Sequence, residues 1–274
     1  PAGIVGNYLF VANLQRELHA IDIATEKGPG NYDTGTAMVG TPVINGSEMY
    51  VAVSRNDESL LAYNLITGTT DWRSTLGDIE TSPLLIGRRL YVTSVQGTLT
   101  CIESGNGETV WTYRLPLHVR TRTVRSSPAS DGTNIIFGGD DGELYAVGAD
   151  DGKLRWSAKT DGSIVASPSV ALGKVYVGSL DNAFYAFDAK TGTRVWKRPL
   201  GSRIFASQAV NDRSVFVGTS GRYVYCLDAQ TGTIVWRAGT NGVVNSPPLI
   251  SGSVVYVGCL DKTLYAFAAG TGEL

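Results

Sequence analysis

Few residues of this 274-residue chain have the types and the spacing that catalysis or metal binding needs. His19 and His118 are its two histidines, and neither has a second histidine or a cysteine close to it in the sequence. Zinc sites use clustered histidine and cysteine ligands, and a histidine that activates a nucleophile needs that nucleophile within reach. The sequence therefore gives little support for either kind of site.

Two acidic pairs, Asp140-Asp141 and Asp150-Asp151, are each followed by a glycine and are the next candidates for metal binding. Calcium takes roughly six to eight oxygen ligands, and neither pair lies in a run of oxygen-bearing side chains. Aspartate and glycine are typical turn residues, so we predict turns at both pairs. No glycine-rich phosphate loop lies between a strand and a helix, and no metal or cofactor is expected.

The irregular stretch Leu115–Arg125 (LPLHVRTRTVR) is the strongest candidate for binding. Loops on a rigid scaffold often carry binding residues, and arginine can hold a carboxylate or phosphate through two parallel hydrogen bonds. The candidate ligand- or partner-binding residues are His118, Arg120, Arg122 and Arg125 of this stretch, together with Arg203 of a later loop. The alternative is a solvated loop whose arginines pair with Glu80, Asp140 or Asp181. The sequence leaves both interpretations open.

Composition and charge exclude several classes of partner. Charged residues make up 18% of the chain and the net charge is −2, so no bulk attraction to nucleic acid or to an anionic membrane is expected. No apolar run approaches the ~18 residues that a membrane-spanning helix needs, which predicts no direct membrane insertion. Cys101, Cys226 and Cys259 are predicted to be small buried strand residues, not parts of a disulfide framework.

The elements that must position these residues belong to an internal repeat. Five tryptophans recur at spacings of 39, 45, 40 and 40 residues: Trp72, Trp111, Trp156, Trp196 and Trp236. A period near forty residues with several strands in each unit is typical of β-propeller blades. Seven copies of the second strand can be aligned, from Tyr8–Asn13 to Val255–Cys259. The tryptophans follow tight glycine turns such as Asp188–Gly192, and each is predicted to dock against the neighbouring blade.

These features predict an all-β fold, a seven-bladed β-propeller of four-stranded antiparallel blades in one domain covering residues 1–274. In most copies a proline begins the first strand, as in Ser167-Pro168, and proline is tolerated at a strand's start or edge because it cannot donate to the ladder. The middle strands are apolar almost throughout, as expected for sheets covered on both faces. The chain stops at Leu274, before the fourth strand of the last blade. That blade is therefore expected to be incomplete, and the chain to be a segment of a longer protein.

The segments AFDAKTGTRVW and CLDAQTGTIVW, preceded by VYVGSLDNAFY and VFVGTSGRYVY, resemble the tryptophan-docking repeats of the pyrroloquinoline quinone (PQQ) enzyme-repeat family. That family includes quinoprotein alcohol dehydrogenases, the outer-membrane assembly lipoprotein BamB and repeat domains of bacterial serine/threonine kinases. Its dehydrogenases hold PQQ over calcium beside a vicinal disulfide, whereas this chain has no Cys-Cys pair. The resemblance therefore implies the architecture without the cofactor, since fold and function separate in such scaffolds.

The resemblance and the sparse catalytic residues favour a non-catalytic binding, scaffold or sensor propeller, and no enzyme activity is expected. Such a propeller would recognise a protein, a peptide or a small anionic ligand at its loop-bearing face or central channel. By resemblance to the scaffold and sensor members of the family, it is expected to work outside the cytoplasm. Two alternatives stay open: a quinoprotein-like oxidoreductase that binds PQQ, and a carbohydrate-binding or carbohydrate-active propeller.

Overall fold

The computed structural model of the protein describes residues 2–5, 7–12, 17–28, 30–33, 38–55, 58–116 and 121–274. These residues form strands, turns and connections, and none of them belongs to a helix. No helix that could cross a membrane is therefore found in the described part of the chain. The chain divides into two compact units, Pro1–Pro128 and Ala129–Leu274.

The described residues of the first unit form three antiparallel sheets, each with four strands in chain order. The first sheet consists of β1 (Ala2–Val5), β2 (Tyr8–Ala12), β3 (Glu17–Asp22) and β4 (Gly30–Asp33). The second consists of β5 (Met38–Asn45), β6 (Glu48–Arg55), β7 (Glu58–Asn64) and β8 (Thr69–Ser74). The third consists of β9 (Leu84–Ile86), β10 (Arg89–Ser94), β11 (Thr98–Glu103) and β12 (Thr109–Arg114).

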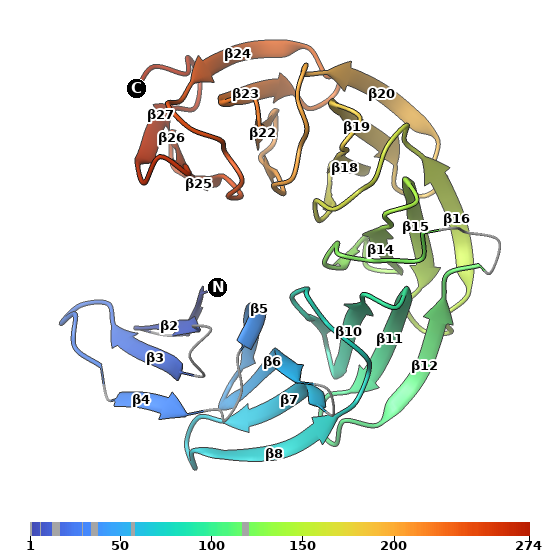
Figure 1. The fold of residues 1–274 in the computed structure, drawn as a ribbon, viewed down its shortest axis with the longest axis vertical. Helices are drawn as coiled ribbons and strands as arrows, with labels where there is room; N and C mark the ends of the chain where they lie inside the picture. Colours follow the sequence, from blue (N-terminus) through green and yellow to red (C-terminus); the bar gives the residue numbers. More distant parts are fainter. Residues whose placement is uncertain are drawn as a thin grey trace. The chain divides into compact units, whose positions relative to one another are not determined.

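The second unit adds four sheets, which follow one another as a fan with β16, β20 and β24 along its outer rim (Figure 1). The fourth sheet consists of β13 (Ala129–Ser130), β14 (Asn134–Gly138), β15 (Glu143–Gly148) and β16 (Leu154–Lys159). The fifth consists of β17 (Ser169–Ala171), β18 (Lys174–Gly178), β19 (Ala183–Asp188) and β20 (Arg194–Pro199). The sixth consists of β21 (Ala209–Val210), β22 (Ser214–Gly218), β23 (Tyr223–Asp228) and β24 (Ile234–Gly239). The seventh has three strands, β25 (Leu249–Ser251), β26 (Val254–Gly258) and β27 (Leu264–Ala268).

The predicted number and order of strands are confirmed over the described residues, including the missing fourth strand of the seventh sheet. The predicted second and third strands agree with the observed ones to within a residue or two at their ends. The first strand of every sheet lies at an edge, where Pro83, Pro128 and Pro168 each immediately precede it. Pro42 is the exception, because it lies inside β5 where the pairing with β6 is irregular.

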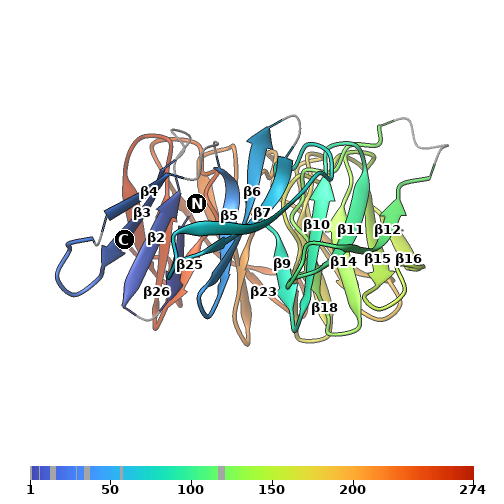
Figure 2. The ribbon, with the colours of Figure 1, turned by 90° about the horizontal axis from the view of Figure 1, so that it is seen from below.

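The core of the second unit lies between neighbouring sheets. Ile136 and Leu144 of the fourth sheet share one buried cluster with Val175 and Tyr185 of the fifth. The fifth and sixth sheets share a second cluster, and the sixth and seventh share a third. Both faces of the middle strands are therefore covered, which explains why these strands are apolar almost throughout. Seen from the side, the strands of this unit run between two opposite sides at which the turns lie (Figure 2).

Tryptophans on the fourth strands of the second, fourth, fifth and sixth sheets join each of these sheets to the next. The indole Nε1 of Trp156 donates to the carbonyl oxygen of Ala189 at 3.0 Å, and the Nε1 of Trp236 donates to that of Ala269 at 2.9 Å. Trp72 and Trp196 make the same contact, at 2.8 Å to Ser104 and 3.3 Å to Ala229. Trp111 lies on β12, the last strand of the first unit, and its docking stays a prediction.

The turn that receives each of these four indoles has a glycine against the ring, and in the fifth and sixth sheets the turn also begins with an aspartate. In the fifth sheet, Oδ1 of Asp188 accepts hydrogen bonds from the backbone N–H groups of Lys190 and Thr191, at 3.1 and 2.9 Å. Gly192 has a φ of 70°, in the left-handed region. A Cβ atom at Gly192 would lie 2.6 Å from Cε3 of Trp156, so the indole packs where a side chain would otherwise be. Gly192 is therefore needed for two reasons: it adopts the left-handed backbone conformation, and it leaves room for the indole ring of Trp156.

Serine hydroxyls at the starts of the first strands connect neighbouring sheets. The backbone N–H of Thr41 donates to Oγ of Ser82 at 2.7 Å, and the N–H of Ser82 donates to Oγ of Ser127 at 3.0 Å. In the second unit the N–H of Ser167 donates to Oγ of Ser207 at 3.0 Å. Each serine therefore satisfies a backbone donor of the preceding repeat, and this explains why a serine so often stands before the proline.

Candidate functional site

The loop-bearing side of the second unit is built by two kinds of segment. The connections that follow the fourth strands contact the turns between the second and third strands of the next sheet. The backbone N–H of Leu180 donates to the carbonyl oxygen of Ser163 at 2.9 Å, and Ser220 and Leu260 make the same bond to Arg203 and Val243, each at 3.0 Å. Side chains from the two segments are therefore close together at each sheet.

The predicted arginine stretch of the first unit is partly described. His118 and Arg120 lie outside the described residues. Arg122 and Arg125 are exposed, whereas Val124 between them is fully buried. A Cβ atom at Gly97 would lie 2.2 Å from the carbonyl oxygen of Arg122, so this stretch packs directly on the turn between β10 and β11. The two exposed arginines are thus presented by an anchored backbone.

The end of the same stretch is fixed by a chain of hydroxyl groups. Oγ1 of Thr93 donates to the carbonyl oxygen of Ser126 at 2.9 Å, and it lies 3.0 Å from Oγ1 of Thr81. All three residues are buried. Buried polar groups that are fully hydrogen-bonded hold a segment in one conformation, so the backbone beside Arg125 is held in place.

Arg203 belongs to the second unit, on the connection between β20 and β21, and it is exposed. The neighbouring Ile204 is fully buried, and a Cβ atom at Gly178 would lie 2.2 Å from its Cγ2. Arg203 therefore extends from a loop that is anchored as firmly as the stretch around Arg122. That all the predicted arginines meet at one site stays a prediction, because they belong to different units.

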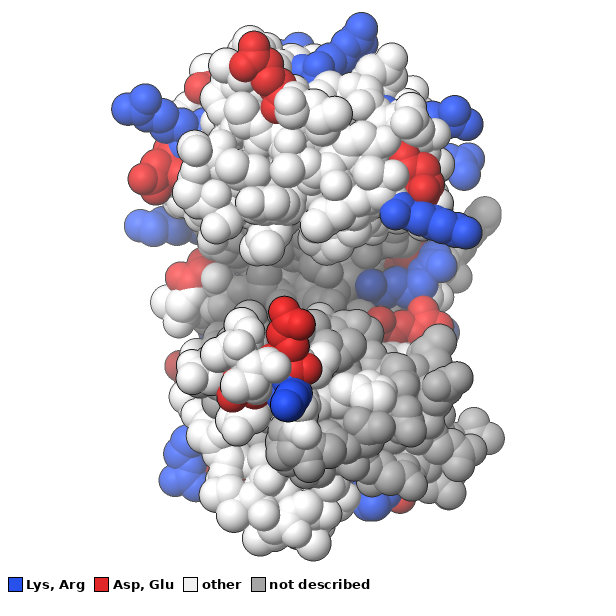
Figure 3. All heavy atoms as spheres, turned by 90° about the vertical axis from the view of Figure 1, so that its left-hand side faces the viewer, with Lys and Arg blue, Asp and Glu red and all other residues white. Residues whose placement is uncertain are grey.

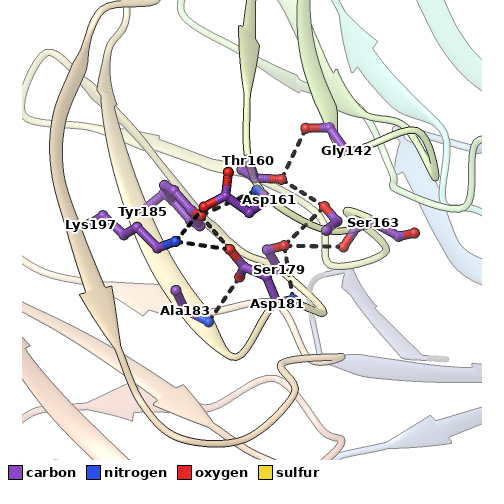
Figure 4. A network of polar contacts seen from close by, with 10 residues as sticks. Gly142, Thr160, Asp161, Ser163, Ser179, Asp181, Ala183, Tyr185 and Lys197 are labelled. Carbon is purple, nitrogen blue, oxygen red and sulfur yellow. Dashed lines mark hydrogen bonds and ion pairs between the residues drawn. The ribbon is translucent and has the colours of Figure 1, made fainter.

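The clearest polar site of the second unit lies at the fifth sheet, where a lysine is held by two carboxylates (Figure 4). Nζ of Lys197, on β20, lies 2.7 Å from Oδ2 of Asp161 and 3.3 Å from Oδ2 of Asp181. It also lies 5.2 Å from the ring centroid of Tyr185. The hydroxyl of Tyr185 donates to Asp181 in turn. Asp161 comes from the connection before the sheet and Asp181 from the turn between β18 and β19, so the lysine ties both segments to the outer strand.

These contacts fix the charges at the fifth sheet. Burial alone would raise the pKa of Asp181, but hydrogen bonds from Tyr185, the backbone N–H of Ala183 and Lys197 outweigh it and leave that pKa below its ordinary value. The hydrogen bond to Asp161, followed by that to Tyr185, raises the pKa of Lys197. Burial and the hydrogen bond to Asp181 raise the pKa of Tyr185. These shifts favour a protonated lysine beside an ionised Asp181, as expected for a hydrogen-bonded ion pair.

The sequence analysis did not find this network, although its signal is present. An aspartate stands four residues before a tyrosine in three sheets of the second unit, and in each the tyrosine hydroxyl donates to the carboxylate. The pairs are Asp141–Tyr145, Asp181–Tyr185 and Asp261–Tyr265. The sixth sheet has Gly221 in the aspartate position, and Tyr225 donates to the carbonyl oxygen of Leu200 at 3.0 Å instead.

One aspartate of each acidic pair, Asp141 and Asp151, accepts backbone hydrogen bonds within a turn. Oδ1 of Asp141 accepts from the backbone N–H of Glu143 at 3.1 Å, and Oδ1 of Asp151 accepts from that of Lys153 at 3.1 Å and from Arg155 at 2.8 Å. Among the described residues, no three His, Cys, Asp or Glu side chains are grouped closely enough to hold a metal ion.

The cysteines differ in one respect from the prediction. Cys101 and Cys226 are buried strand residues, and burial raises the pKa of both thiols, which makes them poor nucleophiles. Cys259 is partly exposed and follows β26 instead of lying within it. Its Sγ lies 3.5 Å from the carbonyl oxygen of Val243 on the neighbouring connection, so this residue contacts a loop where a strand position was predicted.

One cavity of the first unit is relevant to the carbohydrate alternative. It has a volume of about 340 Å³, and threonines supply much of its lining, with Gln96 and Arg114. Glycoside hydrolysis uses a pair of carboxylates, and the described lining of this cavity contains none. The cavity therefore gives no support for a carbohydrate-active site.

Repeated four-stranded antiparallel sheets, joined within the units by docked tryptophans, define the class of the protein as a β-propeller. A solved structure of BamB from Moraxella catarrhalis matches 97% of this chain and 81% of its own chain, with a TM-score of 0.79 and 18% sequence identity. The computationally designed Ika8 protein matches 97% of this chain and 82% of its own, with a TM-score of 0.82 and 14% identity. These likenesses show the fold, an all-β propeller, of which the described residues of this chain form seven sheets.

The chain belongs to the family described as outer membrane protein assembly factor BamB, whose repeats match residues 1–76, 23–113, 114–202 and 197–274. The predicted resemblance to the PQQ-repeat family is thereby confirmed. The outer membrane protein assembly factor BamB of Salmonella typhimurium (strain LT2) is 25% identical over 156 residues, which cover 57% of this chain. The match spans 38% of that relative's length.

Proposed function

We propose that this protein is a non-catalytic scaffold that binds another protein or a peptide through its loop-bearing side. Membership of the BamB family supports this proposal, as does the name of the Salmonella relative, an outer membrane protein assembly factor. The same relationship supports the further proposal of a role in the assembly of outer-membrane proteins and of a location outside the cytoplasm. The proposal treats residues 1–274 as one propeller domain.

The observation that carries the proposal is the anchored arginine stretch. Arg122 and Arg125 are exposed on either side of the fully buried Val124. A binding loop that is already ordered loses less conformational entropy when a partner docks, which favours affinity. Exposed arginines on such an anchored backbone can bind carboxylates of a protein partner.

Catalysis and a bound cofactor are not part of the proposal. The polar groups that could act chemically in the second unit already have partners: Lys197 has two carboxylates, and the turn aspartates accept backbone hydrogen bonds. The buried thiols of Cys101 and Cys226 have raised pKa values. The proposed function therefore needs no PQQ, and the quinone belongs to other members of the wider repeat family.

The experiment is site-specific photo-crosslinking in cells. A photoreactive amino acid at Arg125 should crosslink a defined protein, whereas the same amino acid at Lys190, on the exposed turn between β19 and β20, should not. The crosslinked protein is then purified, and its affinity is measured for the wild type, for Arg122→Glu/Arg125→Glu and for Lys190→Glu. We expect the double reversal to weaken binding by at least about tenfold, because each charge-assisted hydrogen bond contributes about 1.5–3 kcal/mol. Unchanged affinity in the double variant would refute the assignment of this stretch.

A further inference from the structure

The fifth and sixth sheets differ at three pairs of equivalent positions, and the two members of each pair are forty residues apart in the chain. The fifth sheet has Asp161, Asp181 and Lys197, and its lysine is held by both carboxylates. The sixth sheet has glycine at both carboxylate positions, Gly201 and Gly221, and it has Arg237 at the position of the lysine. The sixth sheet therefore keeps a cation, Arg237, at the position of Lys197, but it has no carboxylates at the positions of Asp161 and Asp181.

Arg237 lies instead over an aromatic ring. Its guanidinium carbon is 5.1 Å from the ring centroid of Tyr223, and both residues are exposed, Tyr223 by 37%. The residues equivalent to Tyr223 in the neighbouring sheets are Ala183 and Thr263. An arginine stacked on an exposed tyrosine keeps its hydrogen-bond donors available to a ligand, because the stacking uses only one face of the guanidinium group.

Two more arginines lie on the connection before the sixth sheet and on the turn next to Tyr223. Arg203 and Arg222 are both exposed, and their segments are in direct contact, because the backbone N–H of Ser220 donates to the carbonyl oxygen of Arg203 at 3.0 Å. Arg222 has a φ of 66°. This left-handed conformation favours glycine or asparagine, which occupy the same position in the fourth and fifth sheets as Gly142 and Asn182. The seventh sheet also departs from glycine and asparagine here, with Lys262 at a φ of 69°, so this turn presents an exposed cation in both sheets.

The charges of the two sites are opposite. Residues 160–163 and 180–183 of the fifth site include two aspartates and no cation, whereas residues 200–203 and 220–223 of the sixth include two arginines and no carboxylate. The carboxylate of the next turn, Asp261, accepts the hydroxyl of Tyr265 at 2.7 Å.

We propose that Arg203, Arg222, Tyr223 and Arg237 form a binding site for an acidic peptide segment. Two carboxylates of the peptide take the places that Asp161 and Asp181 occupy beside Lys197 in the fifth sheet. The exposed ring of Tyr223 supplies apolar surface for an adjoining side chain of the peptide. This inference rests on the proposed protein-binding function and adds the chemistry of a partner, at a site separate from Arg122 and Arg125.

The pattern of charge favours a peptide over a membrane or a nucleic acid. Three arginines on the connection, the turn and the outer strand of one sheet suit a few closely spaced carboxylates, whereas a bilayer or a nucleic acid is attracted by an extended basic surface. The net charge of the whole chain is −2. On the side of the molecule drawn in Figure 3, the described cations are interspersed with acidic groups and form no continuous basic surface.

The comparison of the two sheets suggests a variant in which a carboxylate of the chain itself occupies the proposed peptide site. In the fifth sheet Gly162 faces Asp181, and a Cβ atom at Gly162 would lie 2.7 Å from the backbone nitrogen of Asp181. In the sixth sheet the glycine and the larger residue have changed places: Ser202 stands at the position of Gly162, and Gly221 at that of Asp181. Oγ of Ser202 lies 2.5 Å from the position that a Cβ atom would take at Gly221. The double variant Ser202→Gly/Gly221→Asp therefore rebuilds the arrangement of the fifth sheet. Its new carboxylate should engage Arg237 and displace the ligand.

The measurement uses rhodamine-labelled hexaglutamate and hexaglutamine peptides, with fluorescence anisotropy for affinity and amide chemical shifts for position. Hexaglutamate should bind the wild-type chain and shift the amides of residues 201–203, 220–223 and 237, and hexaglutamine should not. Both Ser202→Gly/Gly221→Asp and Arg203→Glu/Arg222→Glu should weaken binding roughly ten- to hundredfold. The control Arg194→Glu/Arg213→Glu changes the net charge by as much as the second variant, at two exposed arginines near turns of the opposite side, and should bind normally.

Three results would overturn the inference. In the first, Ser202→Gly/Gly221→Asp keeps its melting temperature and binds hexaglutamate like the wild type. In the second, the charge control loses as much affinity as the site variants, so that only net charge matters. In the third, inorganic phosphate or phosphatidylglycerol vesicles shift the same amides with equal affinity. A chain that crosslinks its partner at Arg125 but fails these tests would contradict this inference and leave the proposed function intact.

Discussion

Substitution of Gly192 by alanine should separate the two reasons for which the docking turn needs glycine. Gly192 has a φ of 70°, and its Cβ would lie 2.6 Å from Cε3 and 2.7 Å from Cδ2 of Trp156. Gly173 offers a matched control in the same sheet, since its φ is also 70° but nothing lies within 4 Å of its Cβ position. The two variants share the backbone penalty and differ in the contact with the indole.

The left-handed backbone should cost each alanine variant about 1–2 kcal/mol. Gly192→Ala must in addition displace a buried indole that is only 8% exposed and is held by its hydrogen bond to Ala189. Forcing an extra carbon into a packed interface costs about 1–3 kcal/mol. Gly192→Ala should therefore lower the free energy of unfolding by about 2–5 kcal/mol, against about 1–2 kcal/mol for Gly173→Ala.

The assay is thermal and urea unfolding, followed by far-ultraviolet circular dichroism and tryptophan fluorescence. The extra destabilisation of Gly192→Ala should lower its melting temperature by a further roughly 2–10 °C relative to Gly173→Ala. In a Trp156→Ala background the two glycine substitutions should become equivalent, because the clash has been removed. Equal effects in the wild-type background, or an excess that persists without the indole, would refute this account of docking.

Three further predictions concern single contacts of the second unit. Ser207→Ala should destabilise the protein by about 1 kcal/mol in urea unfolding, because the backbone N–H of Ser167 loses its acceptor, whereas the exposed Ser253→Ala should have no effect. Leu172→Asn should raise the melting temperature, because Leu172 has a φ of 53° and asparagine tolerates that conformation better; an unchanged or lower value would contradict this. The pKa of Asp181 is lowered in the folded state, so its ionised form contributes stability that is present above its unfolded pKa of about 3.9 and is lost as pH falls through the folded value. Asp181→Asn should be less stable at neutral pH and lose less stability between about pH 5 and pH 2, and parallel curves for variant and wild type would show that other groups control acid unfolding.

Much of the fold could be read from periodicity because each repeat carries its own strand and turn signals. The turn residues Asp188–Gly192 predict a hairpin, and the apolar runs of the middle strands indicate strands buried on both faces. The contacts between repeats were harder to foresee. The hydroxyl of Ser207 binds the backbone of Ser167, and that pairing depends on how one sheet lies on the next.

The candidate site shows the same division. Arg203 was predicted from its type and its place in a connection. The contact of its loop with the turn before Tyr223, and the contact of Arg237 with that ring, depend on loop packing and strand pairing. Gly221 matters because it lacks the carboxylate that Asp181 has at the equivalent position of the fifth sheet. A glycine in a turn looks ordinary in a sequence, and it becomes informative when the fifth sheet shows an aspartate in that position holding a lysine. A comparison of repeats in three dimensions was needed for that inference.

The direction of the indole contacts has a consequence for how the protein is made. Trp156 and Trp196 each donate to a carbonyl oxygen that lies 33 residues later in the chain. Ribosomes release a polypeptide from its amino end, so domains and their parts emerge in that order. Where such a contact is made, each newly synthesised sheet thus completes the sheet before it, and the tryptophan of the most recent sheet waits at the growing end for its acceptor.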